Sequence, residues 1–357
     1  ITCKNTWTNR EGAEYMYFNN VETRPGVGYP RHWEDQEKWK GGWTLDNSGK
    51  LALSTGSKTN RLMKLFFHPE QPELKDYFEP WTYDYETLIH GGRKNNQPVA
   101  RPRSLVTKQK MEVTWGPNWD DDLAGGQHAR SDVNLTKMGQ DIVFDYEEVF
   151  MRYLPRLCNH CLNPACVAAC PSGAIYKRDE DGVVLVSQDV CRGWRHCVPS
   201  CPYKKIFYNW ETNKAEKCVF CYPRLENGLP QICAETCVGR MRYVGVVFYD
   251  MDKVEAMAAT KNEQDIYENT LDLILDPHDP EVIKAARAEG ISEAWIKAAQ
   301  KSPVYKLVKE WGVALPLHPE YRTLPMVWYV PPLSPILQRV TSDVYLPDAH
   351  EMRVPVQ

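Results

Sequence analysis

The chain has 357 residues, enough for two or three domains or for one core with large insertions. Its 43 Lys and Arg nearly balance its 47 Asp and Glu, and the net charge of −4 argues against nucleic acid or an anionic membrane surface as the partner. No apolar run reaches the length of a membrane span, so a protein of this kind working at a membrane needs another subunit as its anchor.

Residues 21–150 are polar, rich in turns and aromatic side chains, and contain few periodic segments. They predict a loop-rich insertion that wraps over a partner. The acidic run at 120–122 is predicted to be a solvated loop within it.

Residues 151–210 and the segment after them repeat one pattern, in which a group of cysteines is followed by a β-hairpin. Hairpins are predicted at 174–186, with a turn at Asp181-Gly182, and at 206–217, with a turn near Thr212-Asn213. The fold class predicted is α+β, with two ferredoxin-like cluster-binding domains related by pseudo-two-fold symmetry. Residues 151–210 would form one domain, and residues 1–20 with 211–250 would form the other, whose N-terminal part is missing.

The C-terminal third is predicted to begin with one strand at 240–249 and to continue, over residues 251–357, as a helical segment and an extended Pro-rich tail that contacts partner subunits. Asp279-Pro280 opens one predicted helix and Gly290 closes it. Ser302-Pro303 and Gly312 delimit another.

Eleven of the twelve cysteines lie between residues 158 and 237, in three motifs with short spacings. The motifs read Cys158-x2-Cys161-x4-Cys166-x3-Cys170-Pro171, Cys191-x2-Trp194-x2-Cys197-x3-Cys201-Pro202 and Cys218-x2-Cys221-x11-Cys233-x3-Cys237. Bacterial-type ferredoxins hold iron–sulfur clusters with such spacings, and the fourth cysteine of each motif crosses to the other cluster. The chain is therefore predicted to carry electrons.

Applied to the first two motifs, this crossing rule predicts two ligand sets. One [4Fe–4S] cluster would be bound by Cys158, Cys161, Cys166 and Cys201. The other set is Cys170, Cys191 and Cys197, and its fourth position is Trp194. Because indole has no lone pair suited to iron, this set predicts [3Fe–4S]; a complete cluster with water or hydroxide on the fourth iron is the alternative.

The third motif predicts a [4Fe–4S] cluster bound by Cys218, Cys221, Cys233 and Cys3, where Cys3 is the crossing ligand of a fourth motif. Cys237 would then be the crossing ligand of one more [4Fe–4S] cluster. Its other three ligands are expected upstream of residue 1, so the residues of this chain alone would supply one of its four ligands.

Cationic residues surround these motifs, and positive charge near an anionic cluster raises its reduction potential. The candidates for tuning are Arg192, Arg195, Lys204, Lys205, Lys217 and Arg240. The competing interpretation for each is an ordinary solvated surface charge.

Other interpretations of the cysteines are a zinc ribbon, a disulfide framework, or clusters that only hold the fold together without carrying electrons. Zinc does not require interleaved motifs that end in Cys-Pro. His160 and His196 adjoin predicted ligands and could bind iron as in Rieske centres, but the ligand count is complete without them. No catalytic constellation is found.

Several segments resemble the β (iron–sulfur) subunits of membrane-bound respiratory nitrate reductases. The matching stretches are NTWTNREG at 5–12, FNNVET at 18–23, PNWDDD at 117–122, CNHCLNPAC at 158–166, CRGWRHC at 191–197, CPYKK at 201–205 and ALPLHPEYRTLPMVWYVPP at 314–332. Trp194 in place of a cysteine is the most specific of these features.

The resemblance implies three [4Fe–4S] clusters and one [3Fe–4S] cluster, a molybdenum-bis-pterin α subunit that reduces nitrate, and a membrane haem b γ subunit that oxidises quinol. It implies a peripheral location on the cytoplasmic face of the cell membrane, or on the outer face if the α subunit carries a twin-arginine signal. The alternative is the β subunit of a nitrite oxidoreductase or of another molybdenum enzyme. The β subunits of selenate and chlorate enzymes are expected to lack the insertion between about residues 30 and 150.

Overall fold

The computed structural model describes residues 1–24, 27, 39–65, 71–83, 85–90, 102–111 and 152–330. Its helices and strands are short, and its strands form sheets of two or three strands each. Within these residues, no helix combines the length and the apolar character that a bilayer crossing requires.

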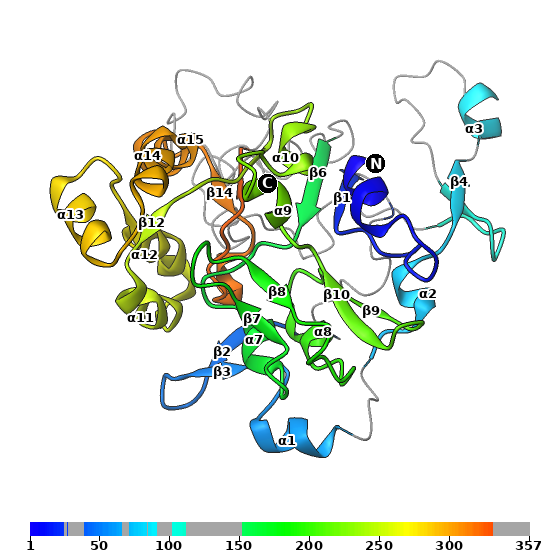
Figure 1. Ribbon diagram of the computed structural model, residues 1–357. Helices are drawn as coiled ribbons and strands as arrows, with labels where there is room; N and C mark the ends of the chain where they lie inside the picture. Colours follow the sequence, from blue (N-terminus) through cyan, green and yellow to red (C-terminus); the bar gives the residue numbers. More distant parts are fainter. Residues whose placement is uncertain are drawn as a thin grey trace, which may run out of the picture.

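The centre of the molecule is built from two similar units of a short helix followed by a hairpin (Figure 1). The first contains α7 (Ala165–Ala169), β7 (Ile175–Lys177) and β8 (Val184–Val186), and the second contains α8 (Cys197–Ser200), β9 (Ile206–Asn209) and β10 (Lys214–Lys217). Both hairpins are antiparallel, and α7 packs against α8. The hairpins predicted from the sequence are present, with Gly182 and Asn213 in the left-handed conformation at their turns.

A two-stranded ladder joins the two ends of the insertion. β1 (Asn19–Arg24) pairs antiparallel with β6 (Arg152–Leu157), in a register that places Asn19 opposite Leu157. The chain therefore leaves the core and returns to it at one place, which makes a long intervening segment compatible with a continuous core.

Between β1 and β6, the described residues form seven short elements. They are β2 (Trp43–Leu45), β3 (Leu51–Leu53), α1 (Lys58–Met63), α2 (Leu74–Tyr77), β4 (Trp81–Tyr83) with its partner β5 (Pro102–Ser104), and α3 (Tyr85–His90). Trp43 and Tyr77 pack this part of the insertion on the chain's own core: the Trp43 Nε1–H donates to the Asn163 carbonyl at 3.0 Å, and Tyr77 is fully buried. β4 and α3 lie away from the main body (Figure 1). The acidic run at 120–122 lies outside the described residues.

Short elements continue through the C-terminal part. They are α9 (Tyr222–Leu225), α10 (Ile232–Glu235), β11 (Arg242–Tyr243), β12 (Phe248–Tyr249), α11 (Val254–Ala258), α12 (Ile266–Asp272), β13 (Ile274–Leu275), α13 (Pro280–Ala288), α14 (Glu293–Lys301), α15 (Pro303–Tyr305), β14 (Leu315–Pro316) and β15 (Trp328–Tyr329). Single turns of 3-10 helix span Met251–Lys253, Glu263–Asp265 and Pro319–Tyr321, and π-helix spans Lys4–Thr8 and Lys306–Glu310.

The helix boundaries predicted in this region are confirmed. The Asp279 side chain caps α13 by accepting from the Glu281 N–H, and Ser302 caps α15 in the same way. The second helix continues as π-helix before it ends near Gly312, which has a positive φ.

The single strand predicted at 240–249 is wrong. β11 pairs with β15, whereas β12 pairs with β13 in a different sheet. Between them the backbone of Gly245 passes so close to Ser302 that a Cβ there would lie 2.5 Å from the Ser302 Oγ. The chain changes sheets at a position where only glycine fits.

The extended Pro-rich tail that was predicted within residues 251–357 is wrong for residues 315–330. These residues are mostly buried within the chain itself, and β15 pairs with both β11 and β14. The large apolar side chains of this segment pack in the core, so it is part of the folded chain and not a free extension. Residues 331–357 lie outside the described part.

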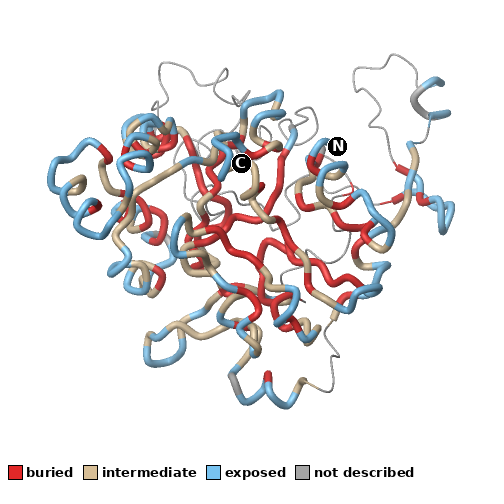
Figure 2. Tube along the Cα trace, in the orientation of Figure 1, coloured by how far each residue is buried: buried red, intermediate tan, exposed pale blue. Residues whose placement is uncertain are grey.

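Buried residues gather where the cysteine-bearing segments meet (Figure 2). The largest hydrophobic core contains eight of the cysteines together with aromatic residues such as Tyr77, Tyr203 and Phe207. The structure is thus a mixed arrangement of helices and small sheets around a cysteine-rich core.

One buried ion pair joins β1 to β6 and helps to attach this ladder to the core. Arg156 on β6 contacts the Glu22 carboxylate on β1, and their side chains are 1% and 3% exposed. The other Arg156 amino group donates to the Tyr203 carbonyl at 3.2 Å, which ties the ladder to the segment after Cys201.

Replacing Arg156 with Met leaves the Glu22 carboxylate buried without its counter-charge. The free energy of unfolding, measured by chemical denaturation, is expected to fall by about 3–5 kcal/mol. The exposed pair between Arg287 and Glu293 provides the control, because Arg287→Met removes a solvated ion pair and should change stability far less. Equal losses in both variants would contradict a special role for the buried pair.

Candidate iron–sulfur centres

One cavity is lined by cysteines from two different motifs. Its walls contain all four residues predicted to bind the first [4Fe–4S] cluster, namely Cys158, Cys161, Cys166 and Cys201. Lys217 and Thr323 line the same cavity. We call it the Cys158 cavity.

The ends of two short helices explain why the fourth cysteine of each motif crosses over. Cys166 lies within α7, whereas Cys170 is its C-cap residue and is extended, with φ −79° and ψ 112°. Cys201 is the C-cap of α8, with nearly identical angles of −75° and 112°. Each is followed by proline, which disfavours helical backbone in the residue before it. The Cys-Pro step therefore turns the fourth cysteine away from its own motif.

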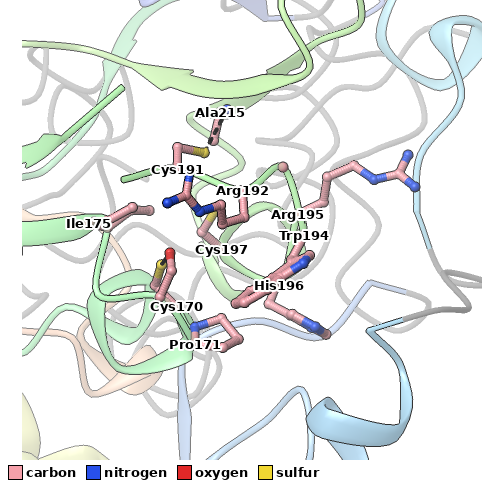
Figure 3. Close-up of a pocket in the computed structure, with 13 residues that line it drawn as sticks. Cys170, Pro171, Ile175, Cys191, Arg192, Trp194, Arg195, His196, Cys197 and Ala215 are labelled. Atoms are coloured by element: carbon pink, nitrogen blue, oxygen red, sulfur yellow. Dashed lines mark hydrogen bonds between the residues drawn. The ribbon is translucent and has the colours of Figure 1, made fainter. Parts of the chain in front are cut away.

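A second cavity contains the predicted three-iron set. It is lined by Cys170, Cys191 and Cys197 together with Trp194, and these residues lie around one space in Figure 3. Gly193 has a φ of +70°, and a Cβ there would lie 2.4 Å from the Asn213 carbonyl oxygen, so the loop that carries Trp194 requires glycine at this position. We call this the Cys191 cavity.

The third predicted set brings Cys3, near the start of the chain, close to the cysteines of the third motif. The negative charges of Cys233 and Cys221 act on the thiol of Cys3, and those of Cys233 and Cys3 act on Cys218. We call these four residues the Cys218 group. Cys237 follows α10, is partly exposed, and lines neither cavity described above.

The Cys158 cavity has both the Cys191 cavity and the Cys218 group as neighbours, and we call this succession of three sets the row. Cys201 of the Cys158 cavity is close enough to Cys197 for its charge to affect the Cys197 thiol. On the other side, Cys158 affects Cys218 in the same way.

Burial disfavours the free thiolate at several cysteines of these sets. Cys170 is an exception, because its burial is outweighed by hydrogen bonds from Ser172 and from nearby backbone N–H groups, which lower its pKa. Burial, followed by the charge of Cys158, raises the pKa of Cys161. Burial, followed by the charges of Cys233 and Cys221, raises the pKa of Cys3 to about 12. Because iron and other metals bind thiolates, positive charge has to be supplied at these sites before the cysteines ionise.

The predicted tuning residues divide into buried, exposed and partly buried ones. Lys204, Lys205 and Lys217 are buried, with exposed fractions of 0%, 0% and 3%. Arg192 and Arg240 are exposed, as expected of ordinary solvated surface charges. Arg195 is partly buried, with its guanidinium 4.9 Å from the centroid of the Tyr208 ring.

Lys205 lies between two of the cysteine sets. Its ammonium group donates to the Tyr17 carbonyl at 3.4 Å and to the Asn20 side chain. Burial and the nearby Arg156 lower its pKa to about 7, while Glu22, Cys201 and Cys3 raise it. Thiolates in both neighbouring sets therefore favour the charged form of this lysine.

Several contacts to the cysteine segments were not predicted from the sequence. Lys214 donates to the Cys191 carbonyl at 2.5 Å, and the Trp7 Nε1–H donates to the Cys221 Sγ at 3.2 Å. Thr323 hydrogen bonds with Cys161 and with the Tyr203 hydroxyl. Trp7 and Thr323 are far from these cysteines in the sequence, and no local pattern identifies them.

Within the described part of the chain, no three His, Cys, Asp or Glu side chains are grouped as ligands of a single metal ion. The cysteines instead line spaces between segments. Their number, sulfur chemistry and arrangement around shared cavities fit polynuclear iron–sulfur clusters.

Comparisons with known proteins agree with this chemistry. Residues 149–247 match the family of 4Fe-4S dicluster domains. The chain is 61% identical to the nitrate reductase beta chain of Bacillus subtilis (strain 168) over 364 residues, which cover all of this chain and 74% of that protein. It is 55% identical to the respiratory nitrate reductase 2 beta chain of Escherichia coli (strain K12) over 365 residues, again all of this chain and 71% of the relative.

A more distant relative corrects one expectation. The selenate reductase subunit beta of Thauera selenatis is 38% identical over 358 residues, which cover all of this chain and 79% of that protein. The match includes the segment between about residues 30 and 150, so this insertion does not separate nitrate reductase β subunits from the others. With 61% and 55% identity along its full length to two of its members, the chain belongs to the family of nitrate reductase beta chains.

Proposed function

We propose that this chain is the electron-transfer subunit of a respiratory nitrate reductase. It would relay electrons from a membrane haem b subunit that oxidises quinol to a molybdenum-bis-pterin subunit that reduces nitrate to nitrite. It would lie at the cytoplasmic face of the membrane as a peripheral subunit. The observation that carries the proposal is the convergence of cysteines from separate motifs on shared cavities arranged in a row.

The proposed ligand sets follow the cavities. Cys158, Cys161, Cys166 and Cys201 would hold one [4Fe–4S] cluster, Cys170, Cys191 and Cys197 a [3Fe–4S] cluster, and the Cys218 group a second [4Fe–4S] cluster. A third [4Fe–4S] cluster would use Cys237. Bound clusters supply one-electron steps between neighbouring sites. The two ferredoxin-like domains and their pseudo-two-fold relation are part of this proposal, supported by the two helix–hairpin units.

The chain's own residues would perform three tasks for these clusters. The cysteines bind iron, and the buried lysines supply positive charge against the thiolates. Packed side chains exclude water from the spaces between the sites. Lys204 and Lys217 also donate to backbone carbonyls near the ligands, which orients the loops that carry them.

Trp194→Cys tests the three-iron assignment. The new thiol restores the missing ligand, so the Cys191 cavity should hold four irons and the EPR signal of the oxidised [3Fe–4S] cluster should disappear. Trp194→Phe is the matched control, because it offers no ligand and should retain that signal. An unchanged spectrum in Trp194→Cys would overturn the assignment, and a wild-type protein with no such signal would favour the four-iron alternative.

Lys205→Met tests electrostatic tuning. Removing a buried positive charge between the Cys158 cavity and the Cys218 group should lower the midpoint potential of a cluster there by roughly 60 mV, equivalent to a tenfold change for a one-electron couple. EPR-monitored redox titration measures the shift. Arg192→Met removes an exposed charge and should shift the potentials much less. Equal shifts in the two variants would refute selective tuning by the buried lysine.

Electron flow through the assembled complex separates this proposal from a purely structural role for the clusters. We expect quinol to reduce the clusters and nitrate to reoxidise them, with both processes followed by EPR under anaerobic conditions. Clusters that remain inert while nitrate is consumed would establish the structural role. Cluster reduction by nitrite at the rate of turnover would instead favour a nitrite oxidoreductase.

A further inference from the structure

His160 occupies an unusual position within the Cys158 cavity. It lies between Cys158 and Cys161, lines the cavity with them, and is only 3% exposed. Its φ of +42° is in the left-handed region, which is uncommon for a residue with a side chain. This conformation places the imidazole inside the molecule rather than at the surface.

Two contacts fix the orientation of the ring. The Val184 N–H on β8 donates to the His160 Nδ1 at 3.0 Å. The second contact is with the Phe220 ring, whose centroid lies 4.4 Å from the centroid of the imidazole. Phe220 lies between Cys218 and Cys221, so the ring pair stands between the Cys158 cavity and the Cys218 group.

The hydrogen bond at Nδ1 determines where the proton of the neutral ring resides. Because Nδ1 accepts a hydrogen bond, it carries no hydrogen, and the imidazole N–H is at Nε2. The Nε2 atom is buried and has no hydrogen-bond partner among the residues that the structure describes. Native proteins rarely leave such a buried donor unsatisfied, because the hydrogen bonds that it loses to water are then not replaced.

The neighbouring Asn159 strengthens this observation. It also lines the cavity, it is 1% exposed, and neither its side-chain nitrogen nor its side-chain oxygen has a partner among the described residues. Consecutive residues of the Cys158-x2-Cys161 loop thus present unsatisfied polar groups in one buried region that is lined by four thiols.

We propose that the His160 Nε2–H donates a hydrogen bond to a sulfur atom of the iron–sulfur cluster bound in the Cys158 cavity. The inference rests on the proposed function, which places a cluster there. A donor of this kind stabilises the more negative, reduced cluster and raises its reduction potential. His160 would therefore raise the reduction potential of the cluster in the Cys158 cavity through this hydrogen bond, and it is not an iron ligand.

His160→Phe tests the proposal in the assembled complex. Phenylalanine keeps a ring against Phe220 but removes both nitrogens, so the midpoint potential of the central [4Fe–4S] cluster should shift to a lower value, while the number of EPR signals stays the same. His196→Phe is the matched control. His196 occupies the same place before Cys197 and lines the other cavity, so its replacement should leave the central potential unchanged.

A spectroscopic measurement on the unsubstituted residue completes the test. Complex labelled with 15N-histidine should show a histidine nitrogen coupled to the reduced central cluster in pulsed EPR, also in the His196→Phe background, and the coupling should vanish in His160→Phe. If His160→Phe does not assemble, the labelled His196→Phe complex decides alone. Absence of the coupling, or an unchanged central potential in His160→Phe, overturns the inference. Absence of iron and acid-labile sulfide would refute the proposed function instead.

Discussion

The structure depends on burying many thiols close to one another in a single core. Nine of the twelve cysteines are buried, and the charges of neighbouring cysteines raise the pKa of several of them after burial itself. Such a core is stable with ionised cysteines only if positive charge compensates them. Iron would supply most of this charge, and the buried ammonium groups of Lys204, Lys205 and Lys217 supply the rest.

The same constraint explains why the fold uses so little regular secondary structure. A two-stranded hairpin is marginal on its own in water, yet most sheets here have only two strands. The hairpins β7–β8 and β9–β10 are instead held in the cysteine-rich core, where Ile175, Val184, Ile206 and Phe207 pack with the cysteines. The insertion is tolerated because the β1–β6 ladder closes it at one point on this core.

The arrangement of the cysteine sets relates this architecture to electron transfer. The Cys158 cavity has a neighbour on each side, and both contacts are made through cysteines, Cys201 toward Cys197 and Cys158 toward Cys218. The His160 ring, beside the cysteines of the Cys158 cavity, contacts the Phe220 ring, which lies between Cys218 and Cys221 in the sequence. Residues adjacent to the cysteines thus also make contacts between neighbouring sets.

Cysteine spacing and the Cys-Pro steps grouped the thiols that line the Cys158 and Cys191 cavities, since a short loop and a helix end constrain where each side chain points. The clusters assigned to these thiols stay a prediction. The two hairpins and the capped helix α13 were likewise predictable from the sequence, because the turn and capping residues that specify them lie within the elements or next to them. The break near Gly245 and the burial of residues 315–330 were not, because each depends on contacts with distant segments. Only the tertiary structure could place Trp7 on Cys221, 214 residues away, because no local pattern records which distant segments will pack together.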